Sequence, residues 1–315
     1  MISILEVITI EVDGAPPAYR WFNIVSNYLG FGLSPAVSIC LAYALDRSTA
    51  VKRELKIAAW CELGYLLFLF VSIPYGIVFS VSADNVYSRG EHFYIYIVMY
   101  FIAILYLSLV TILTAKEFQN RSRLLIYPLI VFLAAETVIQ VAVPDLHVTW
   151  LCVTLLAVLY FIYCNEMWNQ LDALAGLLNQ NSYLNRTAEE PRNGSVLIVL
   201  DVDNFKQVND HYGHLQGDVC LAKIAVCIKK TYASFGYCYR IGGDEFCVLL
   251  KNGEKEEECR KELLQRLEEQ RKKLTYLPTV SYGSAIFSGE DIVEVKDRAD
   301  REMYKYKKER KNRQI

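Results

Sequence analysis

Residues 195–205 read SVLIVLDVDNF, an apolar run that ends on two carboxylates. The β-branched content of Ser195–Leu200, after the turn signal at 193–194, predicts a buried strand, and a helix is expected over Phe205–His211. Carboxylates at the end of a strand can hold a divalent cation while the free N–H groups of the next helix hold phosphate oxygens. The alternative is a helix cap beside a surface acid. This stretch alone leaves both open.

A second acidic element follows at 237–250, where YCYRI and FCVLL flank Gly242-Gly243-Asp244-Glu245. The pattern predicts a β-hairpin with two acids at its tip. The glycine pair lets a bulky ligand approach the backbone, because no Cβ stands in the way. A hairpin acid beside Asp201 would complete a two-carboxylate site for magnesium-assisted phosphoryl chemistry. The alternative, an ordinary hairpin with solvated acids, does not explain the strand-end acids.

Charge is distributed unevenly along the 315 residues, which are 53% hydrophobic and 22% charged with a net charge of −2. Residues 1–165 carry nine Lys or Arg and eleven Asp or Glu, whereas residues 166–315 carry twenty-four of each kind. Such a step indicates two physical environments. The apolar content excludes a disordered chain, and the balanced charge argues against nucleic acid as a partner.

The apolar half predicts an all-α transmembrane bundle of about five helices, a sensor-like domain over residues 1–165. Each stretch reaches or approaches the ~20 residues that cross a bilayer. Buried helices of a soluble domain would need polar outer faces, and these stretches are apolar all round. The expected spans are 21–45, 57–81, 93–115, 124–143 and 146–163.

The basic residues of the loops predict the orientation of this bundle in the lipid bilayer. Seven lie in the loops after the first and third spans, against two on the opposite side. The rule that basic loops stay inside places the N-terminus outside and the C-terminal half in the cytoplasm, in a multi-pass plasma-membrane protein. Met1–Val12 is too short to span and is either an interfacial segment or part of a further helix. Nine cysteines without a C-x-x-C pair indicate reduced thiols and no zinc site.

Two acids fall within the expected spans, and an intramembrane carboxylate suggests a sensing role. Glu62 is placed near the cytoplasmic end of its span, where it could simply reach the interface. Glu136 lies deeper, with Gln140 one turn on, and sensing and a plain interhelical hydrogen bond are equally supported. A kink expected at Pro74 and a polar stripe also allow an internal cavity, the stripe being Asn23, Ser26 and Asn27. No stimulus or ligand is identified.

After the last span, Trp168, Leu171 and Leu174 recur at helical spacing. This predicts that the membrane helix continues directly into a short helical linker over residues 166–180. A catalytic domain is then expected over residues 181–315.

The C-terminal half resembles the GGDEF family of diguanylate cyclases. The resemblance rests on five ordered motifs, LDALAGLLNQ at 171–180, DVDNFKQVNDHYGHLQGDVCL at 201–221, GGDEF at 242–246, TVSYGSA at 279–285 and ADREMYKYKKERKN at 299–312. It implies an α/β (α+β) domain with a central, mostly antiparallel sheet, similar to the palm of class III nucleotidyl cyclases. The implied reaction condenses two GTP into cyclic di-GMP with release of two pyrophosphates. Because each domain would bind one GTP, it also implies a homodimer, with the membrane bundle setting the distance or rotation between the two domains.

The same resemblance assigns roles to residues. Asp201, the carbonyl of Val202, Asp244 and Glu245 match the ligands of Mg²⁺ (or Mn²⁺), and Asp244 and Glu245 match the catalytic pair, Asp244 as the base for the attacking 3′-hydroxyl. Guanine recognition matches Asn209 and Asp218. Phosphate binding matches the backbone N–H groups of Asn204 and Phe205 and the side chains of Lys206, Lys307 and Lys311.

Several positions depart from the family pattern. The family's Arg-x-x-Asp inhibitory site is absent, because residues 233–236 read ASFG. Lys311 stands where Arg is frequent, and the other departures are at Ala175, Gln180, Tyr306 and Arg310. His211 and His214 could bind metal, but a structural role is favoured. The alternating charges of Glu254–Lys273 predict an amphipathic surface helix.

Two other functions compete with the cyclase. A GGDEF domain that only binds nucleotide would have lost metal or base residues, and none is lost here. A transporter or membrane receptor would act mainly through residues 1–165, with the cyclase as an accessory. A transport assay or an identified ligand would distinguish it from a sensor.

Overall fold

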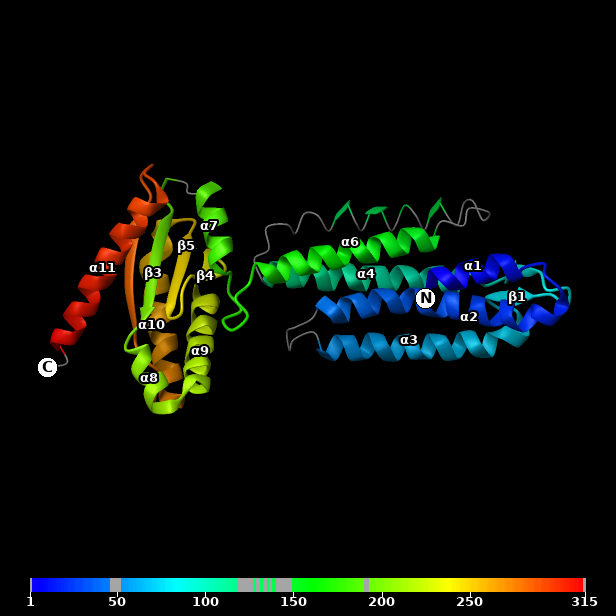
Figure 1. Cartoon of the computed structure of the whole chain (residues 1–315), viewed down its shortest axis with the longest axis horizontal. Helices are drawn as coiled ribbons and strands as arrows, with labels where there is room; N and C mark the ends of the chain where they lie inside the picture. The colour runs from blue at the N-terminus through cyan, green and yellow to red at the C-terminus, as the bar shows by residue number, and fades with distance from the viewer. Residues whose placement is uncertain are drawn as a thin grey trace. The chain divides into compact units, whose positions relative to one another are not determined.

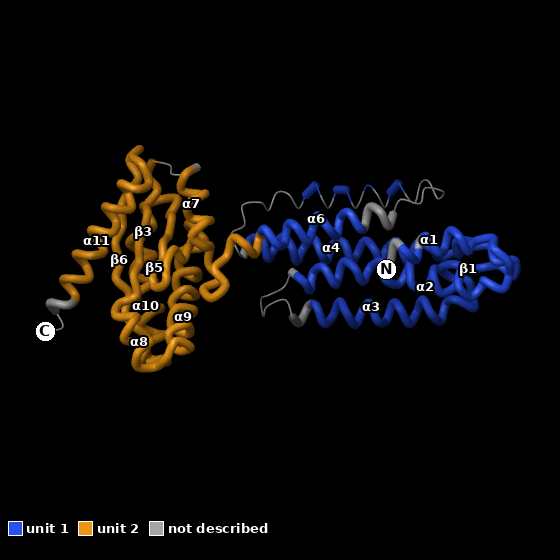
Figure 2. The backbone as a smooth tube through the Cα atoms, in the orientation of Figure 1, with its two compact units in different colours: residues 1–166 blue, residues 167–315 orange. Residues whose placement is uncertain are grey.

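The structure is a computed structural model that describes residues 2–45, 52–117, 127–128, 131–132, 135, 138–139, 149–189 and 193–313. The chain divides into two compact units, residues 1–166 and 167–315 (Figure 2). The predicted span 124–143, with Glu136, lies mostly outside the described residues.

The N-terminal unit is built from long apolar helices. Three of the described helical segments are long and apolar enough to cross a membrane, Pro17–Ala44, Leu55–Tyr75 and Tyr94–Lys116. The elements are α1 (Ile2–Val12), α2 (Arg20–Leu45), α3 (Lys52–Ser72), β1 (Phe79–Val81), β2 (Tyr87–Arg89), α4 (Tyr94–Glu117) and α6 (Thr149–Asn169), with short 3-10 turns at Pro17–Tyr19 and Ile73–Tyr75 (Figure 1).

The predicted span 57–81 is wrong at its end. Helix α3 stops at Ser72, and β1 pairs with β2 in an antiparallel hairpin, Phe79 opposite Arg89. Pro74 has no N–H to donate to the preceding turn of the helix, so it ends α3 instead of kinking it. Apolar composition alone did not separate the helix from the strand.

The polar stripe on α2 joins the helix to the hairpin. Asn23 is fully buried, and its Nδ2 donates to Asp13 Oδ1 and Asn85 Oδ1, both at 3.1 Å. Asn27 donates to Asn23 Oδ1 at 2.7 Å. These buried amides are therefore satisfied by protein partners.

The C-terminal unit is a four-stranded antiparallel sheet with helices around it (Figure 1). The strand order is β4-β5-β3-β6, with β3 in the interior of the sheet. The elements are α7 (Gln180–Glu189), β3 (Val196–Val202), α8 (Phe205–Tyr212), α9 (His214–Tyr232), β4 (Gly236–Arg240), β5 (Glu245–Leu250), a 3-10 turn (Gly253–Lys255), α10 (Glu256–Lys273), β6 (Val280–Ile286) and α11 (Ile292–Arg313). The antiparallel sheet agrees with the predicted fold.

Alternation along β3 builds two cores, one on each face of the sheet. Ile198 and Leu200 pack with buried residues of α9 and α10, whereas Leu197 and Val199 pack with residues of α7 and α11. Because successive side chains of a strand point to opposite faces, a continuous apolar run covers both. The predicted strand 195–200 extends two residues further, so Asp201 lies within the ladder.

The helical linker is shorter than predicted. Helix α6 ends at Asn169, and Leu171 instead forms an isolated bridge with Leu178. Asp172 is responsible, because its Oδ1 accepts from the backbone N–H groups of Leu174 and Ala175, at 3.1 and 2.7 Å. This local turn competes with the helix.

The cysteines of the C-terminal unit are buried in its cores. Burial raises the pKa of Cys238 to about 12 and also raises that of Cys247. These thiols stay protonated and pack as small apolar groups. The described cysteines are all free, as expected.

Candidate functional site

The two acidic elements meet at one end of the sheet. Antiparallel pairing sets Asp201 of β3 directly opposite Glu245 of β5, and the Val202 N–H donates to the carbonyl of Asp244 at 3.1 Å. Directly opposite residues have Cα atoms about 4.5–5.5 Å apart. The expectation that a hairpin acid lies beside Asp201 is confirmed.

Lys307 of α11 reaches this end of the sheet. Its ammonium donates to Asp201 Oδ1 and lies 3.9 Å from Asp203 Oδ1. Partial burial lowers the pKa of Lys307, but the hydrogen bond to Asp201 and the charges of Asp201, Asp203 and Asp244 outweigh it and raise the pKa. The lysine therefore stays cationic at neutral pH, beside the acids.

Asp203 had no assigned role in the sequence, yet it organises the base of the site. Its carboxylate accepts from Thr279 Oγ1 at 2.6 Å and Ser281 Oγ at 2.5 Å, both next to or within β6. Arg310 NH1 lies 3.5 Å from the same carboxylate. Asp203 thus joins β3, β6 and α11. The sequence signal for Asp203 was its place as the second acid of the DVD motif, but the partners of Asp203 depend on the register of β6.

The tip of the hairpin is held by Arg240. Its guanidinium donates to the Gly243 carbonyl at 2.7 Å and to Asp172 Oδ1 at 3.0 Å. The side chains of Arg240 and Asp172 are only 14% and 26% exposed. One planar guanidinium therefore fixes the acidic turn to the segment after α6.

The free backbone N–H groups at the start of α8 lie close to Asp203 in the chain. Asn204 adopts a left-handed conformation, φ +54°, at the N-cap position of α8, where its side chain makes no capping hydrogen bond. The first N–H groups of a helix have no partner within it, and a left-handed residue beside them forms an anion-binding concavity. Phe205 and the exposed Lys206 follow directly. This geometry suits a phosphate.

Asn209 lies on α8 and Asp218 on α9, and the Asn209 side chain approaches the backbone of α9 at Gly217. A Cβ at Gly217 would lie 1.9 Å from Asn209 Oδ1, so the amide of α8 occupies the space beside the backbone of α9. Among the described residues, Asn209 Oδ1 is buried without a hydrogen-bond partner. A buried unsatisfied acceptor is costly, and it suits a ligand that donates an N–H. The exposed Asp218 adds a second acceptor.

The donor set fits magnesium. Mg²⁺ keeps several waters and uses one or two carboxylates together with substrate phosphates. Asp201 and Glu245 are opposite each other, with Asp244 next in the chain. Within the described ranges, no group of three or more His, Cys, Asp or Glu side chains is arranged to hold a metal ion by itself. The protein part of the site therefore leaves coordination positions to water and substrate.

Other expected residues fall elsewhere. His211 and His214 are exposed, and His211 contacts the Gln207 carbonyl through Nδ1 at 2.9 Å. The side chain of Lys311 lies outside the described residues. Helix α10 buries Leu263 and Leu267 but leaves Leu264 38% exposed, as an amphipathic helix requires.

The stretch 233–236 enters the sheet at Gly236, the first residue of β4. A Cβ there would lie 2.3 Å from the carbonyl oxygen of Leu249 on β5. An aspartate at this position would therefore displace the strand pair.

Comparison with known proteins finds similarity in the C-terminal unit. Residues 169–313 match the family described as "Diguanylate cyclase, GGDEF domain". Diguanylate cyclase DgcZ of Escherichia coli is 34% identical over 166 residues, covering 49% of this chain and 55% of that protein. Diguanylate cyclase DgcS of Shewanella oneidensis is 45% identical over 92 residues, covering 27% of this chain and 31% of that protein.

Among solved structures, the GGDEF domain of DgcB from Caulobacter crescentus in complex with c-di-GMP is 27% identical. The match covers 44% of this chain and 90% of that one, with a TM-score of 0.39. The chain spans about half or less of the length of these two curated relatives.

Proposed function

We propose that the protein is a diguanylate cyclase, because residues 169–313 match the GGDEF family. It condenses two GTP into cyclic di-GMP and releases two pyrophosphates. The observation that carries the proposal is the pairing of Asp201 with Glu245, next to Asp244 and beside the start of α8. The reaction needs carboxylates for a cation and a base within reach of the nucleotide, and this arrangement supplies both.

Asp201, the Val202 carbonyl, Asp244 and Glu245 would hold Mg²⁺ (or Mn²⁺). When bound, the metal neutralises charge on the phosphates and the leaving pyrophosphate. These residues are oxygen donors on adjacent strands, as a hard cation requires.

Asp244 takes the proton from the attacking 3′-hydroxyl in this proposal. Arg240 holds the turn that carries it, through the Gly243 carbonyl. The proton acceptor is therefore on a restrained hairpin tip, and an oriented base contributes more than a mobile one.

Cations and N–H groups hold the triphosphate. Lys307, Lys206 and Lys311 supply positive charge, and the N–H groups of Asn204 and Phe205 supply donors at the start of α8. Lys307 pairs with Asp201 in the structure, so it would exchange this carboxylate for phosphate oxygens when nucleotide binds.

Guanine is read by Asn209 and Asp218. The buried Asn209 Oδ1 accepts from a guanine N–H group, and the Asp218 carboxylate accepts from the neighbouring donors of the base. Adenine lacks the N1–H and the 2-amino group, so the site favours GTP over ATP.

Catalysis requires a homodimer, because each domain binds one GTP and the two must face each other. The membrane part is proposed as a bundle of about five helices in a bacterial plasma membrane, with the N-terminus outside and the cyclase domain cytoplasmic. Three apolar helices support membrane insertion. The bundle would regulate the distance or rotation between the two cyclase domains.

The test uses the purified full chain with GTP and Mg²⁺, assayed for cyclic di-GMP beside an Asp244→Ala variant. We expect product from the wild type and at least a hundredfold less from the variant. Asp210→Asn, on the exposed side of α8, is the matched control and should retain activity. Nucleotide binding without product, or equal product from Asp244→Ala, would refute the assignment.

A further inference from the structure

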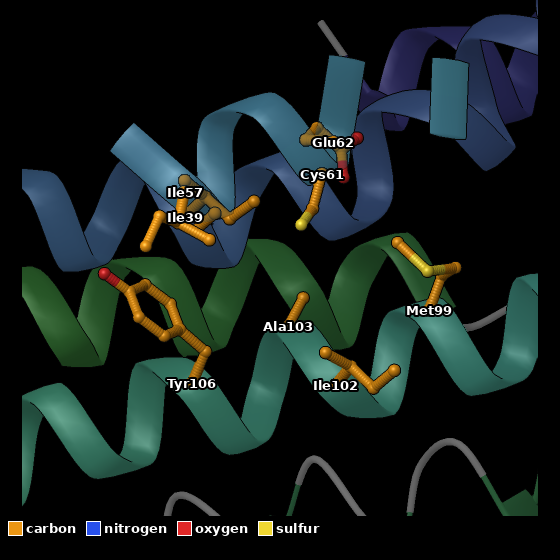
Figure 3. Close-up of a pocket in the computed structure, with 9 residues that line it drawn as sticks. Ile39, Ile57, Cys61, Glu62, Met99, Ile102, Ala103 and Tyr106 are labelled. Carbon is orange, nitrogen blue, oxygen red and sulfur yellow. The ribbon is translucent and has the colours of Figure 1, made fainter. Parts of the chain in front are cut away.

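A cavity of about 270 Å³ lies within the N-terminal unit, among α2, α3 and α4. Helix α2 packs against both α3 and α4. The cavity lies between α3 and α4. Figure 3 shows Ile39 of α2, Cys61 and Glu62 of α3, and Ile102 and Ala103 of α4 around it. The walls are almost entirely apolar, with one carboxylate.

Glu62 is the unusual member of this wall. It is 7% exposed, and neither carboxylate oxygen has a hydrogen-bond partner among the described residues. It follows the beginning of the apolar span at Leu55 by seven residues, about 10 Å along the helix axis. The alternative that Glu62 simply reaches the interface is not favoured, because its side chain is buried on the wall of the cavity.

Among the described residues, no hydrogen-bond donor pairs with the Glu62 carboxylate. Burying an isolated charge is costly unless a cation or hydrogen-bond donors pair with it. The described residues that line the cavity include no Lys, Arg or His. A stabilising interhelical hydrogen bond, the usual structural reason for such a residue, is absent from this part of the chain. The site is complementary to a ligand with a positive charge.

The cavity also has an apolar route of access. Ile57 and Ile102 on its walls are 56% and 55% exposed, and Cys61 is exposed. In a membrane helix, such side chains face lipid. A ligand that partitions into the bilayer can therefore reach Glu62 from the side.

We propose that this cavity binds a lipophilic monoamine, whose ammonium pairs with Glu62 while its apolar body fills the space against α4. A cavity of about 150 Å³ holds benzene, so this one holds about eleven non-hydrogen atoms. Glu62 lies about 10 Å along the helix axis from the first residue of the apolar span, which argues against the headgroup of a bilayer lipid, since headgroups lie at the membrane surface. The site is separate from the nucleotide site and does not depend on cyclase activity.

The test measures binding to the full chain in lipid nanodiscs by calorimetry, with empty nanodiscs subtracted. The probe is phenylbutylamine, and phenylbutanol is its uncharged counterpart of the same size. We expect saturable binding of the amine and at least tenfold weaker binding of the alcohol. Equal affinity of the two, or no saturable binding of the amine, would overturn the proposal.

Variants separate charge from cavity. Glu62→Gln keeps the shape and removes the charge, and Ala103→Leu fills the space while it leaves the carboxylate. Each should weaken amine binding at least tenfold, whereas Glu166→Gln, an exposed carboxylate of α6, should bind as the wild type does. Wild-type affinity in Glu62→Gln would exclude charge recognition.

A second readout does not require the variants to fold. Saturating amine should slow alkylation of Cys61 by a small membrane-permeant thiol reagent at least severalfold. Cys40 is also exposed but does not line the cavity, so its rate should not change. Unchanged alkylation of Cys61 would contradict occupation of the cavity.

Discussion

Replacing Gly217 by alanine would place a methyl group where the Asn209 amide now lies. The added Cβ would be 1.9 Å from Asn209 Oδ1, 3.0 Å from its Cγ and 3.1 Å from Cζ of Phe205. The Phe205 ring can yield by a few tenths of an ångström, but the Asn209 side chain must rotate away. The substitution therefore removes the proposed guanine contact without touching Asn209 itself.

Two effects of opposite sign follow. Alanine in place of glycine within a helix stabilises it by about 1 kcal/mol. Loss of a hydrogen bond that leaves a donor of the bound base unpaired costs about 1–3 kcal/mol. The first acts on folding and the second on nucleotide binding, so we expect a stable protein with a KM for GTP raised about fivefold to a hundredfold.

Initial rates over a range of GTP concentrations measure this change. Asn209→Ala should raise KM by a similar factor, and the double variant should not exceed the larger single effect by much, because both changes remove one contact. Gly64→Ala is the matched control, since a Cβ at this helical glycine meets nothing within 4 Å. An unchanged KM in Gly217→Ala would show that Asn209 does not read guanine.

Three further predictions concern the rest of the C-terminal unit. Asp203→Asn should lower the free energy of unfolding by about 2 kcal/mol and the calorimetric Tm by about 5 °C, because two hydroxyl hydrogen bonds lose their charged acceptor. A Tm equal to that of Asp210→Asn would contradict this. Arg240→Ala should lower kcat about tenfold to a hundredfold, because the carbonyl of Gly243 loses its donor and the acidic turn loosens. Arg240→Lys should restore kcat only in part. Full activity of the alanine variant would show that Arg240 does not restrain the turn. Cyclic di-GMP should not lower initial rates, because residues 233–236 carry no charge; a rate halved by added product would reveal a different inhibitory site.

Features with a local cause were predictable from the sequence. The strand before Asp201 and the hairpin of 237–250 follow from β-branched runs and a glycine turn, and the structure has both. Their pairing brought Asp201 beside Glu245, as the two acidic motifs indicated.

Features that depend on long-range register were not predictable. Asp203 finds its hydroxyl partners just before β6 and within it, seventy-six and seventy-eight residues away in sequence. Arg240 finds Asp172 across sixty-eight residues. No local pattern specifies such partners, because they are set by how strands align.

Local signals were also overridden in two places. The spacing of Trp168 and Leu171 predicted a continuous helix. Helix α6 ends at Asn169 instead, because the Asp172 side chain accepts hydrogen bonds from backbone N–H groups in a turn. Apolar composition over 57–81 concealed a strand, because a short buried strand and a helix end have the same hydropathy.

The ratio of products formed from GTP by the purified full chain tests the central claim most directly. Chromatography with mass detection of the nucleotide, together with a pyrophosphate assay, gives both amounts in one reaction. The account predicts one cyclic di-GMP and two pyrophosphates for every two GTP consumed, in the presence of Mg²⁺. Pyrophosphate or phosphate released without cyclic dinucleotide, or no consumption of GTP, would contradict it.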